Sequence, residues 1–73
     1  MTHPKAISIA KAVDLRSVTS ACMETYQLYG YKAWIFDYVK AESLCRQNGL
    51  KGFEIDAAID IMESRFNSWM EGF

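Results

Sequence analysis

The chain has no run of apolar residues long enough to cross a membrane, and 23% of its 73 residues are charged. Because a membrane-spanning helix needs about 20 predominantly apolar residues, we expect no membrane partner. The chain contains eight lysine and arginine residues and nine aspartate and glutamate residues, which gives a net charge of −1 at pH 7. This balance lacks the basic excess that is typical of nucleic-acid-binding domains. The composition therefore neither suggests nor excludes nucleic acid as a partner.

Cysteine and histidine are also scarce, since His3, Cys22 and Cys45 are the only ones. The two cysteines form no Cys-x-x-Cys pair and have no histidine at metal-ligand spacing, which argues against zinc. No other residues have the spacing of a catalytic or phosphate-binding site. We therefore predict no enzymatic activity, no metal and no cofactor. We interpret both cysteines as reduced core thiols of a cytoplasmic protein, because no secretory signal precedes them.

The residues that are abundant are apolar. They make up 51% of the chain and include four Tyr, four Phe and two Trp, a composition that excludes disorder. A chain of this length buries only about 60% of the surface that its unfolded form exposes. Because such thin cores are commonly supplemented by disulfides, metals or subunit contacts, we expect self-association to complete this one.

The last 21 residues carry the clearest pattern in the sequence. Apolar side chains recur every three or four positions, as on one face of a helix. They are Ile55, Ile59, Met62, Phe66, Trp69 or Met70, and Phe73. The pattern predicts a helix over residues 53–73, with Glu54 and Asp56 placed in its first turn to complement the helix dipole.

Two further helices are predicted before it. Asp14 is a good N-cap, and the apolar positions that follow it at helical spacing predict a helix over 14–29 that ends at Gly30. Residues 31–48 predict the next helix, although Trp34 to Val39 are rich in strand-forming residues and a strand competes there. Gly49 is positioned to close a Schellman motif, with Leu50 touching the last turn.

These elements predict an all-α fold. We expect one domain over residues 1–73, with helices over 14–29, 31–48 and 53–73 and an N-terminal arm or short helix over 1–13. The last two helices form a C-terminal αα-hairpin, and the whole is dimeric or higher. Residues for self-association are the large apolar ones that one small core cannot cover, with Phe36 lying off the main stripe of its helix. They are Trp34, Phe36, Phe66 and Met70.

One side of the last helix carries acidic residues at spacings of three and four. Such a charged edge is usually a solvated face. Once self-association covers the apolar stripe, this edge and the aromatic residues at its end remain for another protein, and charge beside tryptophan is frequent at binding hot spots. The candidate partner-binding residues are Asp56, Asp60, Glu63, Asn67, Trp69 and Phe73.

From these features we expect a small cytoplasmic regulatory protein that binds and modulates another protein, of the antirepressor, inhibitor or antitoxin type. The alternative is a small dimeric transcriptional regulator whose first two helices contact DNA. Dimerisation could then gather basic residues on one face. Those residues are Lys5, Lys11, Arg16, Lys32, Lys40 and Arg46.

Overall fold

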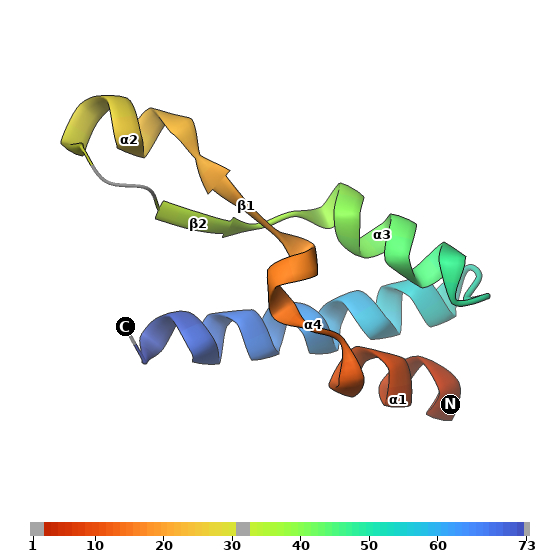
Figure 1. Ribbon diagram of the computed structural model, residues 1–73. Coiled ribbons are helices and arrows are strands. Elements are labelled where there is room, and N and C mark those ends of the chain that lie inside the picture. The colour runs from red at the N-terminus through yellow and green to blue at the C-terminus, as the bar shows by residue number, and fades with distance from the viewer. Residues whose placement is uncertain (1–2, 31–32, 73) are drawn as a thin grey trace.

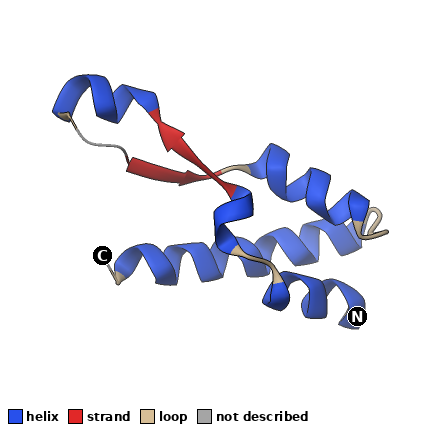
Figure 2. Cartoon of the chain, in the orientation of Figure 1, coloured by secondary structure: helices blue, strands red, loops and turns tan. Residues whose placement is uncertain are grey.

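The computed structural model describes residues 3–30 and 33–72, and it contains both helices and strands (Figure 1; Figure 2). In chain order the elements are α1 (Pro4–Ala12), the 3₁₀ helix η1 (Leu15–Val18), β1 (Thr19–Cys22), α2 (Met23–Tyr29), β2 (Ala33–Phe36), α3 (Tyr38–Gln47) and α4 (Phe53–Glu71). The segment over residues 1–13, for which the sequence left a helix or an arm open, contains a helix that begins at the N1 proline, Pro4.

The all-α prediction is wrong, because β1 and β2 form a two-stranded antiparallel sheet in which Thr19 lies opposite Phe36 and Cys22 opposite Ala33. The helix predicted over 14–29 is replaced by η1, β1 and α2, and the helix predicted over 31–48 shrinks to α3. Side-chain packing between strands and burial override intrinsic helix preference where strand-forming residues can pair. The competing strand at Trp34 to Phe36 is the one that forms.

The helical body consists of α1, η1, α3 and α4. Ala6 and Ala10 of α1 are fully buried, as is Ala58 of α4, and these small side chains line the contact between the two helices. The guanidinium of Arg65 on α4 donates to the backbone oxygens of Ala10 at 2.6 Å and Val13 at 3.0 Å. It therefore binds carbonyls left without helical partners at the C-terminal end of α1.

The turn between α3 and α4 is the one that the sequence predicts. Gly49 has φ +82°, its N–H donates to the oxygen of Arg46, and the N–H of Leu50 donates to the oxygen of Cys45. This pair of bonds is the Schellman motif, and Leu50 is buried beneath it. The chain then reverses, so that α3 and α4 lie side by side as an antiparallel hairpin (Figure 1).

The core lies between α1, α3, α4 and η1. Its buried side chains are Ala6, Ala10, Val18, Ala41, Cys45, Leu50, Ile55, Ala58 and Met62. We call β1, α2 and β2 together the arm, because they project from this body towards the side where α4 ends (Figure 1). Asp37 joins the arm to α3. Its carboxylate accepts from the Ser20 hydroxyl at 2.6 Å and from the N–H of Lys40 at 3.1 Å, and its own N–H donates to the oxygen of Val18.

Candidate protein-binding cleft

A cleft lies where the arm meets the C-terminal half of α4. Its lining residues are Arg16 of η1, Thr19 of β1, Trp34 of β2 and Trp69 of α4, and its volume is about 270 Å³. Three separate stretches of the chain thus contribute to one cavity: the consecutive elements η1 and β1, then β2, and the end of α4. Both tryptophans of the chain line it.

Aromatic packing fixes the position of the cleft. Phe36 packs edge-on against Tyr38 at 4.9 Å between ring centres, and its ring lies tilted against that of Phe66 of α4 at 5.9 Å. Phe66 in turn lies 6.3 Å from Trp69. Side chains alternate between the two faces of a strand, so Trp34 lies on the same face of β2 as Phe36. The contact of Phe36 with α4 therefore directs Trp34 towards the end of α4 that carries Trp69.

The polar residues of the cleft have different roles. Thr19 is buried, and its hydroxyl donates to the backbone oxygen of Arg16 at 3.2 Å, which links η1 to the start of β1. Arg16 itself is exposed and brings a positive charge to the rim. No carboxylate is among the lining residues that the structure describes. The cleft therefore combines two indole surfaces with one guanidinium.

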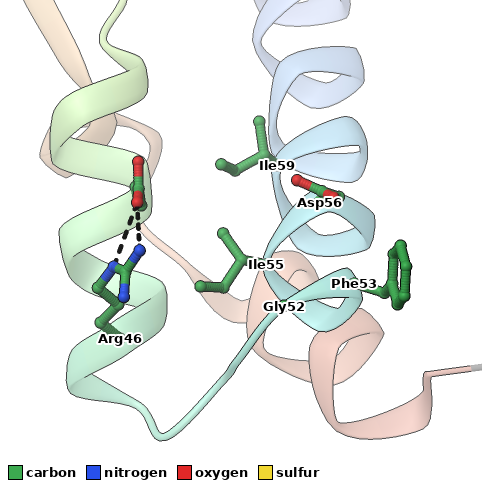
Figure 3. A pocket seen from close by; sticks show the side chains of 7 residues that line it. Arg46, Gly52, Phe53, Ile55, Asp56 and Ile59 are labelled. Atoms are coloured by element: carbon green, nitrogen blue, oxygen red, sulfur yellow. Dashed lines mark hydrogen bonds and ion pairs between the residues drawn. The ribbon is translucent and has the colours of Figure 1, made fainter.

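A second cleft, of about 350 Å³, lies between α3 and α4 (Figure 3). Figure 3 shows Ile55 and Ile59 pointing from α4 towards α3, while the ring of Phe53 points away from it. The guanidinium of Arg46 is paired with Glu42 at 2.6 Å. Its one basic group, Arg46, is thus already paired, its aromatic ring is turned outward, and its remaining charged residue is the exposed Asp56, so this cleft lacks the indole surfaces and the basic group that the first one offers.

The acidic edge predicted from the sequence is only partly available for a partner. Asp56, Asp60 and Asn67 are exposed on α4. Glu63 is half-buried, and the hydroxyl of Tyr38 donates a hydrogen bond to its carboxylate. Trp69 is half-buried and lines the cleft. Phe73 lies outside the described residues.

The residues predicted for self-association differ in their surroundings. Phe66 is buried in the body and Met70 is half-buried, whereas Trp34 is 52% exposed. The argument that placed Phe36 off the main face of a helix is wrong, because Phe36 belongs to β2 and packs against the body. Cys45 is fully buried as predicted, but Cys22 is half-buried on β1 rather than in the core.

The basic residues of the DNA-binding alternative are distributed over several elements. Lys5 and Lys11 are exposed on α1, and Arg16 lines the cleft. The ammonium of Lys40 donates to the backbone oxygen of Thr19 at 2.9 Å, and Arg46 is paired with Glu42. Lys32 lies outside the described residues. Two of the described basic side chains are therefore engaged within the chain.

Within residues 3–30 and 33–72, no group of three His, Cys, Asp or Glu side chains is placed to hold a metal ion. Over the same residues, no helix combines the length and the apolar character that crossing a membrane requires. Comparison of the chain with protein-family models, curated proteins and solved structures found no match. The chemistry of the cleft is therefore the basis for a functional proposal.

Neither Arg16 nor Thr19 was a candidate cleft residue in the sequence, because the cleft exists only once β1 and β2 pair. The available signal was the pair of short segments Thr19–Cys22 and Ala33–Phe36 on either side of Gly30. Gly30 has φ +77°, a left-handed conformation that helps the chain turn back.

Proposed function

We propose that this chain is a small cytoplasmic regulatory protein that acts by binding another protein through the Trp34–Trp69 cleft. The observation that carries the proposal is the convergence of both tryptophans and Arg16 on one surface cavity. Tryptophan and arginine are enriched among the residues that dominate binding energy at protein interfaces. Trp34 is also 52% exposed, so a partner could cover indole surface that the chain itself leaves in solvent.

The lining indicates the chemistry of the partner segment. A cavity of about 270 Å³ between indole rings fits one large apolar side chain. Arg16 at the rim favours a neighbouring carboxylate on the partner, because guanidinium groups form strong, directional hydrogen bonds with carboxylates. We therefore propose a partner segment with an apolar anchor flanked by acidic residues. The exposed part of the α4 edge, Asp56, Asp60 and Asn67, would then lie towards a different part of the partner surface.

This mode of action corresponds to an antirepressor, an inhibitor or an antitoxin, which block or redirect another protein without chemistry of their own. The DNA-binding alternative is less well supported, because Lys40 and Arg46 already bind acceptors within the chain. A cytoplasmic location suits Cys45, whose thiol is buried in the core.

The test compares affinity capture from host lysate by the parent chain, Trp34→Ala, Trp69→Phe and a matched control, Phe53→Ala. Phe53 is 80% exposed but distant from the cleft, so its replacement removes a surface aromatic without touching the cavity. A protein that binds the parent and Phe53→Ala, and is lost with both tryptophan variants, is the expected result.

The protein so captured is then purified and titrated against the chain while tryptophan emission is followed. Since the only two tryptophans line the cleft, binding there should shift their emission. Asp60→Lys is measured in parallel to show whether the α4 edge takes part. Equal affinity of the parent and Trp34→Ala for the captured protein would refute the cleft as the binding surface.

A further inference from the structure

The hydrogen bonds of the sheet show which backbone groups face outward. The N–H of Asp37 donates to the oxygen of Val18, so these two residues form a hydrogen-bonded antiparallel pair. Hydrogen-bonded and non-hydrogen-bonded pairs alternate along an antiparallel ladder. Ser20 and Ile35 therefore exchange bonds with each other. It follows that the N–H and C=O groups of Trp34 and Phe36 point to the outer edge of β2.

The two edges of the sheet differ in the hydrogen-bond partners of their outward-facing backbone groups. On β1 the outward-facing groups belong to Thr19 and Ala21, and the Thr19 oxygen accepts a bond from the Lys40 ammonium at 2.9 Å. On β2 no described residue other than those of β1 bonds to the backbone of Trp34 or Phe36. An uncovered strand edge is a template for pairing with another strand. Within the described residues, a side chain occupies one outward-facing acceptor on β1 and none on β2, so β2 is the more open template.

We infer that the open edge of β2 pairs antiparallel with β2 of a second copy, giving a four-stranded sheet across a two-fold dimer axis. In the register that joins the outward-facing groups, Trp34 lies opposite Phe36 of the second copy. Ile35 then lies opposite Ile35, on the axis and in a close, non-hydrogen-bonded pair. Both contacts join apolar side chains, and apolar cross-strand pairs stabilise antiparallel sheets.

Charge also fits this register. Asp37 is the only charged residue among 33–37, and the two-fold places it opposite Ala33 of the second copy. No like charges meet across this stretch of the interface. An isolated two-stranded sheet is marginal in water, whereas three or more strands with an apolar face are stable. Pairing of two copies supplies those strands from a surface that is its own complement.

The exposed apolar area of the arm is close to what a small dimer interface buries. Trp34 is 52% exposed, Ile35 48%, Met23 56% and Leu28 75%, all on the arm. Taking about 200 Å² for each large side chain, they offer on the order of 400–500 Å² per copy. With the strand backbone added, this approaches the ~600 Å² per partner that marks the lower end of specific interfaces. The dimer should therefore form at micromolar concentrations.

This inference does not rest on the proposed cleft. Trp34 takes part in both surfaces, but the residue that the experiment changes, Ile35, lies on the opposite face of the sheet from Trp34 and does not line the cleft. The experiment uses sedimentation velocity of the parent chain, Ile35→Lys, Ile35→Glu and an equimolar mixture of the two variants. The parent should dimerise. Each variant alone should weaken the dimer by about tenfold or more, because two like charges meet on the axis.

The mixture of Ile35→Lys and Ile35→Glu should recover the dimer, since opposite charges then meet at the same position. Val39→Lys is the matched control, because Val39 is also β-branched and apolar and is 78% exposed, but it lies on α3 outside the arm. It should dimerise like the parent. Circular dichroism of every variant checks that the fold is retained.

A cysteine cross-link provides an independent readout. In a Cys22→Ser background, Ile35→Cys should form an intermolecular disulfide rapidly, because directly opposed non-hydrogen-bonded residues have Cβ atoms about 4.5–5.5 Å apart. Ala33→Cys, two residues away from the axis, should not. A parent chain that stays monomeric at 100 µM, an undiminished dimer in Ile35→Lys, or faster cross-linking through position 33 would each overturn the proposal.

Discussion

Asp37 is the residue on which the junction between arm and body depends. It caps α3 by accepting from the N–H of Lys40, and it binds the Ser20 hydroxyl across the sheet. The hydrogen bond from Ser20, followed by that from the Lys40 N–H, holds the pKa of Asp37 below its ordinary value of 3.8, and the charge of Lys40 acts in the same direction. These bonds favour the ionised carboxylate.

The pH dependence of stability follows from that shift. Because the pKa of Asp37 is lower in the folded than in the unfolded chain, its contribution is complete above the ordinary value of 3.8 and is lost as the pH falls through the folded pKa. We expect Asp37→Asn to be less stable than the parent at pH 7, with the difference shrinking below pH 4. Urea unfolding followed by circular dichroism measures it. Asp60→Asn, at an exposed position, is the control and should track the parent.

Cys45 provides a second residue-scale prediction. Burial raises the pKa of its thiol, and the negative charge of Glu42 raises it further, so little thiolate forms near neutral pH. In a Cys22→Ser background, we expect Cys45 to resist a thiol reagent in native buffer and to react fully in denaturant. Rapid modification of the folded variant would contradict its place in the core.

At the scale of the elements, the attachment of α1 to α4 depends on a few named contacts. The two bonds from Arg65 join the end of α1 to α4 over a long sequence separation. A hydrogen bond that involves a charged group contributes about 1.5–3 kcal/mol, and here one partly buried nitrogen of Arg65 makes both bonds, so we count them as one such contribution. Exposed ion pairs within one helix, such as Arg46 with Glu42, contribute about 0.5 kcal/mol or less.

We therefore expect Arg65→Ala to lower the free energy of unfolding by about 1.5–3 kcal/mol, with fraying of α1. Arg46→Ala, which removes the same side chain from an exposed position, should lower it by about 0.5 kcal/mol or less. Chemical denaturation of both variants measures the contrast. Similar losses in the two would show that Arg65 does not hold α1 in place.

The elements that could be predicted from the sequence are those that depend on residues close together in the chain. The α3–α4 turn follows from Gly49 and Leu50, and the apolar spacing of Ile55, Met62 and Phe66 marks the buried face of α4. The arm could not be predicted in this way, because the pairing of Thr19 with Phe36 joins residues far apart in sequence. Of the residues that line the cleft, the sequence assigned only Trp69 to partner binding, because Thr19 and Trp34 come together only through that same pairing.

At the scale of the whole molecule, the chain is elongated. A compact domain of this length has a radius of gyration of about 11 Å, whereas this chain has 13.4 Å and extends over 43 × 22 × 17 Å. The difference reflects the projecting arm (Figure 1). Segments with few buried apolar contacts open at lower free energy than the core. Stability should therefore be divided unevenly between arm and body.

Amide hydrogen exchange measures that division. In dilute solution, where monomers prevail, we expect the amides of α4 around Ala58 and Met62 to exchange most slowly and those of β1 and β2 to exchange early. Both α4 side chains are fully buried in the core. Equal protection of arm and body in the monomer would show that the whole chain opens as a single cooperative unit.

The bond from Lys40 to the Thr19 oxygen has a consequence for the size of any assembly. A sheet that could add strands at both edges would grow without limit, as fibrils do, and the Lys40 ammonium occupies one of the acceptors that a strand added at β1 would need. Lys40→Met keeps the aliphatic stem but frees the Thr19 carbonyl. Light scattering of that variant should rise slowly with time at concentrations where the parent remains clear, so that a single ammonium group separates a finite complex from a growing polymer.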